Sequence, residues 1–172
     1  VLSAQSLQIL SPQTLELTYT SVVQSPTDAP RPLWLGVGGA TNPPLPADFQ
    51  VVADGQPVEV LQVGSVRRAA SAETKRYQAT VETRVFLRLA LPLAPGAALT
   101  VNGPEVTNAV AGNQDQRPSQ VIHVNPIGFT AQADKRAYLG YWLGDLGELV
   151  LSNWVNAPFE LRRESDGSIA FA

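Results

Sequence analysis

Cysteine is absent from the 172-residue chain. A disulfide framework and a thiolate metal site are therefore both excluded. Any β-sandwich in this protein has to be held by packing alone, without the bridge that joins the two sheets of antibody domains. The missing cysteine leaves the cellular compartment open.

Charge and long apolar runs are also scarce. Charged residues make up 16% of the chain and the net charge is −3, which argues against a nucleic-acid partner. No apolar run reaches the ~20 residues that a membrane helix needs, so we expect no membrane partner. Apolar residues make up 44%, and the 13 glycines and 14 prolines favour short strands joined by turns.

Histidine occurs once, as His123. A Ser–His–acid triad would have to use it, and a zinc site would lack a second histidine. Glycoside hydrolysis needs two carboxylates at a defined separation, but Asp134, Asp145 and Glu148 fall at predicted strand ends or turns, where acidic side chains commonly bond the backbone. We therefore expect no catalytic residue, no metal and no cofactor in this chain.

Alternation of apolar and polar residues predicts strands, most clearly over residues 81–91. Glu82, Arg84 and Arg88 fall on one face of that strand, which indicates a half-exposed strand rather than a helix. Phe86 interrupts the polar row, and we expect a loop to cover it. The residues predicted to face inward are Val81, Thr83, Val85, Leu87, Leu89 and Leu91.

No window of helical length shows a 3.6-residue period, so the predicted fold class is all-β. The dipeptides Asp54-Gly55, Asn102-Gly103 and Asp166-Gly167 favour the positive φ angles of tight turns and predict hairpins. The other predicted strands are residues 6–10, 14–20, 49–53, 57–63, 98–101, 120–124, 136–143, 148–151, 159–163 and 168–171.

A composition break divides the chain, because residues 111–119 contain no large apolar residue. We predict a β-sandwich domain at 1–111, a linker at 112–119 and an immunoglobulin-like domain at 120–172. The second unit shows fewer strands than the about seven of an immunoglobulin-like sandwich. Its strand pattern runs up to Ala172, so we expect that unit to be incomplete. The expected architecture is two immunoglobulin-like β-sandwich units in series.

One segment of the second unit resembles a known family. Ile122, Val124, Asn125, Gly128 and Phe129, followed by Asp134-Lys135-Arg136-Ala137-Tyr138, resemble the opening of the N-terminal immunoglobulin-like domain of family-nine glycoside hydrolases, with its Ile-x-Val-Asn-Gln-x-Gly-Tyr pattern. Pro126 replaces the usual Gln, and Phe129 replaces Tyr. The resemblance implies a non-catalytic domain that packs on a cellulase-like catalytic domain of the same polypeptide. It also implies a bacterial protein of polysaccharide degradation that is secreted, periplasmic or at the cell surface.

Aromatic side chains are the candidate interaction residues. Tyr138 and Trp142 share one face of the predicted strand 136–143, where they would stand roughly 13 Å apart, and Trp154 lies in a turn-rich segment. These rings are suited to stacking on sugars, to meeting a catalytic domain or to filling a core. The leading interpretation is a structural and interaction module that docks on a following catalytic domain. The alternative is a carbohydrate-binding module with a polysaccharide partner.

Overall fold

The computed structural model describes residues 3–25, 27–30, 32–33, 35–36, 39–40, 44–73, 78–111, 119–130, 132–163 and 165–171. Strands dominate these ranges, and the helical residues in them form short 3-10 turns. The predicted all-β class is confirmed. No helix in the described part of the chain is long and apolar enough to cross a membrane.

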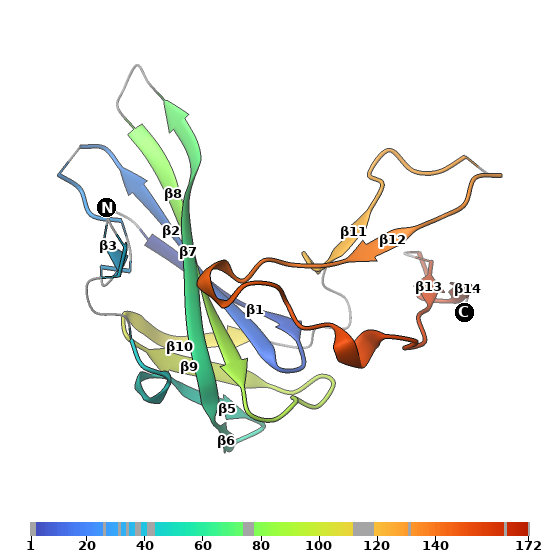
Figure 1. Cartoon of the computed structure of the whole chain (residues 1–172), viewed down its shortest axis with the longest axis horizontal. Coiled ribbons are helices and arrows are strands. Elements are labelled where there is room, and N and C mark those ends of the chain that lie inside the picture. Colours follow the sequence, from blue (N-terminus) through green and yellow to red (C-terminus); the bar gives the residue numbers. More distant parts are fainter. Residues whose placement is uncertain are drawn as a thin grey trace.

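Two four-stranded antiparallel sheets form a β-sandwich (Figure 1). The first sheet has the order β1 (Ser3–Ser11), β2 (Thr14–Val23), β8 (Gln78–Leu89) and β7 (Val60–Glu73). The second has the order β10 (Val106–Ala111), β9 (Leu99–Gly103), β5 (Gln50–Ala53) and β6 (Gln56–Val58). The chain changes sheet after β2, after β6 and after β8, so each sheet combines segments that are distant in sequence.

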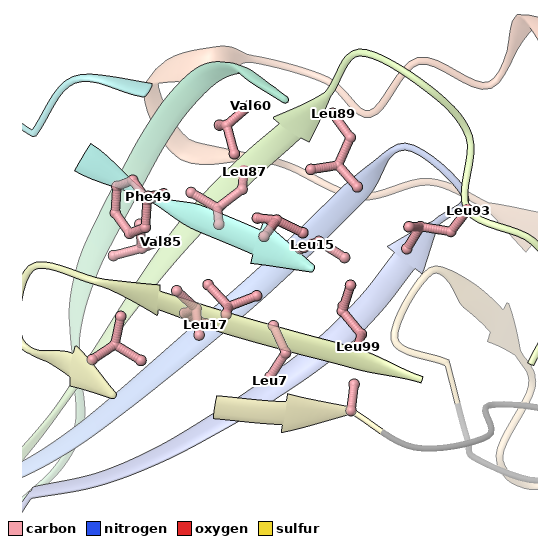
Figure 2. Close-up of a cluster of buried hydrophobic side chains, with 14 of the residues drawn as sticks. Leu7, Leu15, Leu17, Phe49, Val60, Val85, Leu87, Leu89, Leu93 and Leu99 are labelled. Atoms are coloured by element: carbon pink, nitrogen blue, oxygen red, sulfur yellow. The ribbon is translucent and has the colours of Figure 1, made fainter. Parts of the chain in front are cut away.

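The main core lies between the two sheets, as Figure 2 shows for Leu15, Leu87 and Leu99. Alternate residues of β2 and β8 are buried in this core, as predicted from the period of two. Thr83, on the same face of β8, is also buried. Leu91 was predicted to face inward with them, but its side chain is 69% exposed. The prediction was wrong because β8 ends at Leu89 and the alternation does not continue beyond the ladder.

Two of the three predicted turn dipeptides join strands as expected. Asp54 and Gly55 have φ angles of 49° and 78° between β5 and β6. Asp166-Gly167 lies between β13 (Leu161–Arg162) and β14 (Ile169–Phe171), where Gly167 has φ 69°. Asn102-Gly103 instead belongs to β9, and the reversal falls at Pro104-Glu105. Strand β10, which follows that reversal, was not predicted.

Strand lengths differ most from the predictions where tertiary pairing decides them. The predicted strand 57–63 is divided between β6 and β7, and β7 continues to Glu73 because it pairs with β8 along its length. The prediction of a strand over residues 136–143 was wrong in length, because β12 covers only Ala137–Leu139. The predicted strand 148–151 is reduced to an isolated bridge between Glu148 and Trp142.

Residues after the predicted linker form short elements that lie beside the sandwich (Figure 1). Residues 112–118 of the linker lie outside the described residues, and the division into two units stays a prediction. The short elements of the chain are β11 (Ile122–Val124) paired with β12, β13 paired with β14, β3 (Leu35–Gly36) paired with β4 (Gly39–Ala40), and the 3-10 turns η1 (Pro46–Asp48), η3 (Gly144–Leu146) and η4 (Ser152–Trp154).

Candidate functional site

A second hydrophobic cluster lies on the outer face of the first sheet. Leu10 and Phe86 point to this face, and Val121, Leu143 and Leu149 cover them. Phe86 is fully buried, so the prediction that a loop covers it is confirmed. We call the covering segment, residues 119–121 and 140–151, the strap. It flanks the β11–β12 hairpin on both sides in sequence and anchors the base of that hairpin to the sandwich.

The strap approaches β7 closely at a glycine. Gly144 has φ 62°, and a Cβ atom there would lie 2.1 Å from the carbonyl oxygen of Ser65. The next residue, Asp145, accepts a hydrogen bond of 2.6 Å from the Ser65 backbone N–H. Strand β7 is an edge strand, and its edge donors need partners. The strap therefore provides a hydrogen-bond acceptor for one backbone N–H of the β7 edge, and it also covers the outer face of the sheet.

A group of polar side chains fastens the strap to the sheet. We call Glu16, Arg84, Gln120 and Tyr141 the polar lock. The Tyr141 hydroxyl donates a 2.7 Å hydrogen bond to Glu16 Oε2, and Arg84 donates to Gln120 Oε1 at 3.0 Å and to the Tyr141 oxygen. Thr18 donates to the other carboxylate oxygen of Glu16 at 3.0 Å. Glu16 is fully buried, and a buried carboxylate requires such partners.

Electrostatics keep Tyr141 and Arg84 in the protonation states that their hydrogen bonds require. Burial raises the pKa of Tyr141, and the adjacent Glu16 carboxylate raises it further, so the hydroxyl stays a donor. Burial alone would lower the pKa of Arg84, but its hydrogen bond to Glu82 and the charge of Glu16 outweigh burial and raise it. The Tyr141 ring also packs edge-on against Phe86, with 6.3 Å between ring centroids. Polar and apolar contacts therefore hold the strap at the same place.

The β11–β12 hairpin projects from this anchored base (Figure 1). Its register pairs Ile122 with Leu139 on one face and His123 with Tyr138 on the other. Ile122, Val124 and Leu139 are 51%, 58% and 44% exposed. One face of the hairpin is thus apolar and open, while the other carries an imidazole and a phenol.

Among the described residues, large exposed apolar side chains are more numerous after residue 119 than before residue 111. In the described part of 3–111 they are Leu33, Leu45, Leu61, Leu91 and Val110. In the described part of 119–171 they are Ile122, Val124, Ile127, Phe129, Tyr138, Leu139, Trp142, Val150, Val155, Phe159, Leu161 and Ile169. The surface of the second segment is therefore more apolar than that of the sandwich, and this asymmetry identifies it as the candidate interaction surface.

The three predicted site aromatics have different environments. Tyr138 and Trp142 are 66% and 62% exposed, whereas Trp154 is half-buried against the second cluster. Sequence reasoning missed Tyr141. Its hydroxyl and ring contact the first sheet, whereas the side chain of the adjacent Trp142 is exposed. No local signal identified Tyr141, because its partner Glu16 falls on the polar row of an alternating strand, between Thr14 and Thr18, and only the structure shows that this carboxylate is buried.

The mixed face of the hairpin borders a shallow hollow of about 360 Å³. The rings of Phe129 and Tyr138 line it, together with His123, Asp134 and Arg136. Other lining residues are Val124 and Asn125. The hollow combines two aromatic rings with hydrogen-bonding groups, a combination that suits a polar ligand with an apolar face.

The residues considered for catalysis make different contacts. Asp134 is 3.6 Å from Arg136 at the hairpin loop, Asp145 binds the edge of β7, and the backbone of Glu148 forms an isolated β-bridge with Trp142. His123 Nε2 is 2.9 Å from the Gly140 carbonyl oxygen. Among the described residues, no three His, Cys, Asp or Glu side chains are grouped so as to hold a metal ion.

Comparisons with known proteins add no relative. No protein-family model matches the chain, and neither the curated proteins nor the solved structures contain a match.

Proposed function

We propose that the protein is a non-catalytic interaction module in which a β-sandwich presents the β11–β12 hairpin to a second protein domain. The contrast between the two ends of the hairpin region carries this proposal. Val121 and Leu143 at the base are fully buried, while Ile122 and Val124, directly beyond, are more than half exposed. A two-stranded hairpin is at best marginally stable by itself, so a covering partner would stabilise it.

The proposed partner is a catalytic domain of the same polypeptide, of the cellulase-like family-nine glycoside hydrolase type. The resemblance at residues 122–138 supports this choice, and the resembling residues have defined roles in the hairpin. Asn125 accepts the Ile127 N–H at 3.1 Å and donates to the Gly128 carbonyl at 2.8 Å. Gly128 has φ 92°, a conformation that favours glycine. The parent protein would act in polysaccharide degradation outside the bacterial cytoplasm, at the cell surface, in the periplasm or after secretion.

The experiment begins by reading the coding sequence that follows the codon for Ala172. The domain encoded there is expressed separately, and its binding to residues 1–172 is measured by calorimetry. We expect binding that Ile122→Asp abolishes, because a charge would be buried in an apolar interface. The matched control is Leu61→Asp, since Leu61 on the sandwich is 50% exposed against 51% for Ile122. A stop codon after Ala172, or equal losses from both variants, would overturn the proposal.

The hollow beside Tyr138 supports one alternative, a carbohydrate-binding module. Rings such as Tyr138 and Phe129 stack on the apolar faces of sugars, and Arg136 and Asp134 have the polarity to bond sugar hydroxyls. Trp142 is also exposed, but it does not line the hollow. We rank this function second because it gives no role to the apolar face of the hairpin.

A further inference from the structure

We propose that the polar lock fixes the orientation of the β11–β12 hairpin, so that Tyr141 acts as a positioning residue for docking without touching the partner. This inference rests on the proposed function for its biological meaning, but the geometry that carries it lies within the described chain. It also assigns a role to the buried Glu16, which is not part of the main core of the sandwich.

The strap is held by contacts that are separate from the main core. Its cluster lies on the outer face of the first sheet, whereas the main core lies on the inner face. Phe86 and Leu87 illustrate the division, since both are fully buried but belong to different clusters. The strap can therefore loosen while the sandwich stays folded, because loosening removes only the smaller cluster.

The contacts of the polar lock are directional. A hydrogen bond from the Tyr141 hydroxyl to the Glu16 carboxylate is charge-assisted, and such bonds are shorter and stronger than neutral ones. Arg84 bonds both Tyr141 and Gln120, so it joins the two stretches of the strap. Apolar packing on Phe86 alone would tolerate rotation and sliding, whereas this bonding pattern fixes one arrangement.

Short links transmit that arrangement to the hairpin. The Gly140 N–H donates to the Val121 carbonyl at 3.0 Å, and His123 Nε2 is 2.9 Å from the Gly140 carbonyl oxygen. The first hairpin pair, Ile122 and Leu139, follows directly. Since Gly140 and Tyr141 are adjacent in the chain, the direction in which the hairpin leaves the sandwich is set beside the lock.

A fixed hairpin is preorganised for docking. A partner that binds one orientation loses affinity in proportion to the fraction of molecules that adopt another. Tyr141→Phe removes one hydroxyl, keeps the ring against Phe86 and leaves the exposed surface of the hairpin unaltered. It should therefore weaken docking through orientation alone.

The absence of cysteine allows this orientation to be measured directly. Spin labels attached at Gln56→Cys on the sandwich and Ala133→Cys in the hairpin loop report one distance distribution by double electron–electron resonance. We expect a single narrow distribution in the otherwise unchanged chain and a clearly broader one with Tyr141→Phe. Tyr138→Phe, which removes the same group from an exposed ring, should leave the distribution narrow. A broad distribution in the parent chain, or a narrow one with Tyr141→Phe, would overturn the proposal.

Hydrogen exchange gives a second readout on the chain without labels. The amides of Gly140 and Leu149 donate within the strap, and Tyr141→Phe should raise their exchange rates roughly tenfold to a hundredfold. The Leu87 amide, in the central strand of the sandwich, should exchange at an unchanged rate. An equal acceleration at Leu87 would mean that Tyr141 stabilises the whole fold, which contradicts a positioning role.

Binding of the downstream domain then separates the two proposals. Weaker binding with Tyr141→Phe, together with the broadened distance distribution, supports both. If the domain binds neither form although the distribution broadens as expected, the proposed function fails and the lock stands. If both forms bind equally although the hairpin is loosened, docking does not depend on orientation and the lock has no positioning role.

Discussion

Phe86 and Leu87 are neighbours in sequence, and both side chains are fully buried. They point to opposite faces of β8, as the period of a strand requires. Leu87 contributes to the core between the sheets, and Phe86 to the cluster under the strap. Strand β8 is therefore covered on both faces at Phe86 and Leu87, and this is where the strap is anchored.

Leu87→Ala should lower the free energy of unfolding by about 2–5 kcal/mol, because it removes a fully buried side chain and leaves a cavity. Arg88→Ala should cost at most about 0.5 kcal/mol, since Arg88 loses only a surface hydrogen bond to Gln62. Urea unfolding of both variants measures the difference. Equal effects would show that the register of β8 is wrong.

Glu82 should stabilise the folded protein near neutral pH and lose this contribution in acid. Burial alone would raise its pKa, but hydrogen bonds and charge from Arg84 and Arg68 outweigh burial and lower it from 4.5. A carboxyl with a lowered folded-state pKa stabilises the protein above its unfolded pKa, and the contribution is lost as pH falls through the folded pKa. The difference in unfolding free energy between the wild type and Glu82→Gln should therefore shrink below about pH 4.5. A difference independent of pH would contradict the ion pairing.

At the scale of elements, the strap contains two glycines with similar φ angles and different surroundings. Gly144 has φ 62° and faces the Ser65 carbonyl, whereas Gly147 has φ 77° and open space where a Cβ would lie. Substitution strains the backbone at both positions, but only at Gly144 does it also create a clash. The pair therefore separates local strain from docking of the strap.

Gly147→Ala should cost about 1–3 kcal/mol from backbone strain alone. Gly144→Ala should cost more and should also release the strap, because the new methyl group would overlap the backbone of β7. Hydrogen exchange at the Leu149 amide is the measurement, since that amide donates to the Tyr141 carbonyl. Similar exchange in the two variants would show that close approach to β7 does not hold the strap.

At the scale of the whole molecule, most of the large exposed apolar side chains among the described residues lie after residue 119. The purified chain is expected to have no glycosidase activity towards soluble β-glucans or chromogenic glucosides, because Asp134 pairs with Arg136 and Asp145 bonds the backbone of β7. Turnover that disappears when Asp134, Asp145 or Glu148 is substituted would contradict this expectation.

Retention on insoluble cellulose and chitin distinguishes the two candidate functions. The interaction module predicts no retention of the wild type or of Trp142→Ala, together with concentration-dependent self-association of the isolated chain through its exposed apolar surface. Sizing in solution measures the second effect. Clear retention that Trp142→Ala abolishes would favour the carbohydrate-binding module.

The sequence by itself determined the all-β class and the inward faces of β2 and β8, because alternation and turn dipeptides are local signals. It also indicated that Phe86 would be covered. Only the tertiary structure decided what covers it, because Tyr141 and Glu16 are distant in the chain and their pairing leaves no local pattern. The same holds for the length of β7, which depends on pairing with β8, and for the different environments of Tyr138, Tyr141 and Trp154, which depend on where the strap meets the sheet.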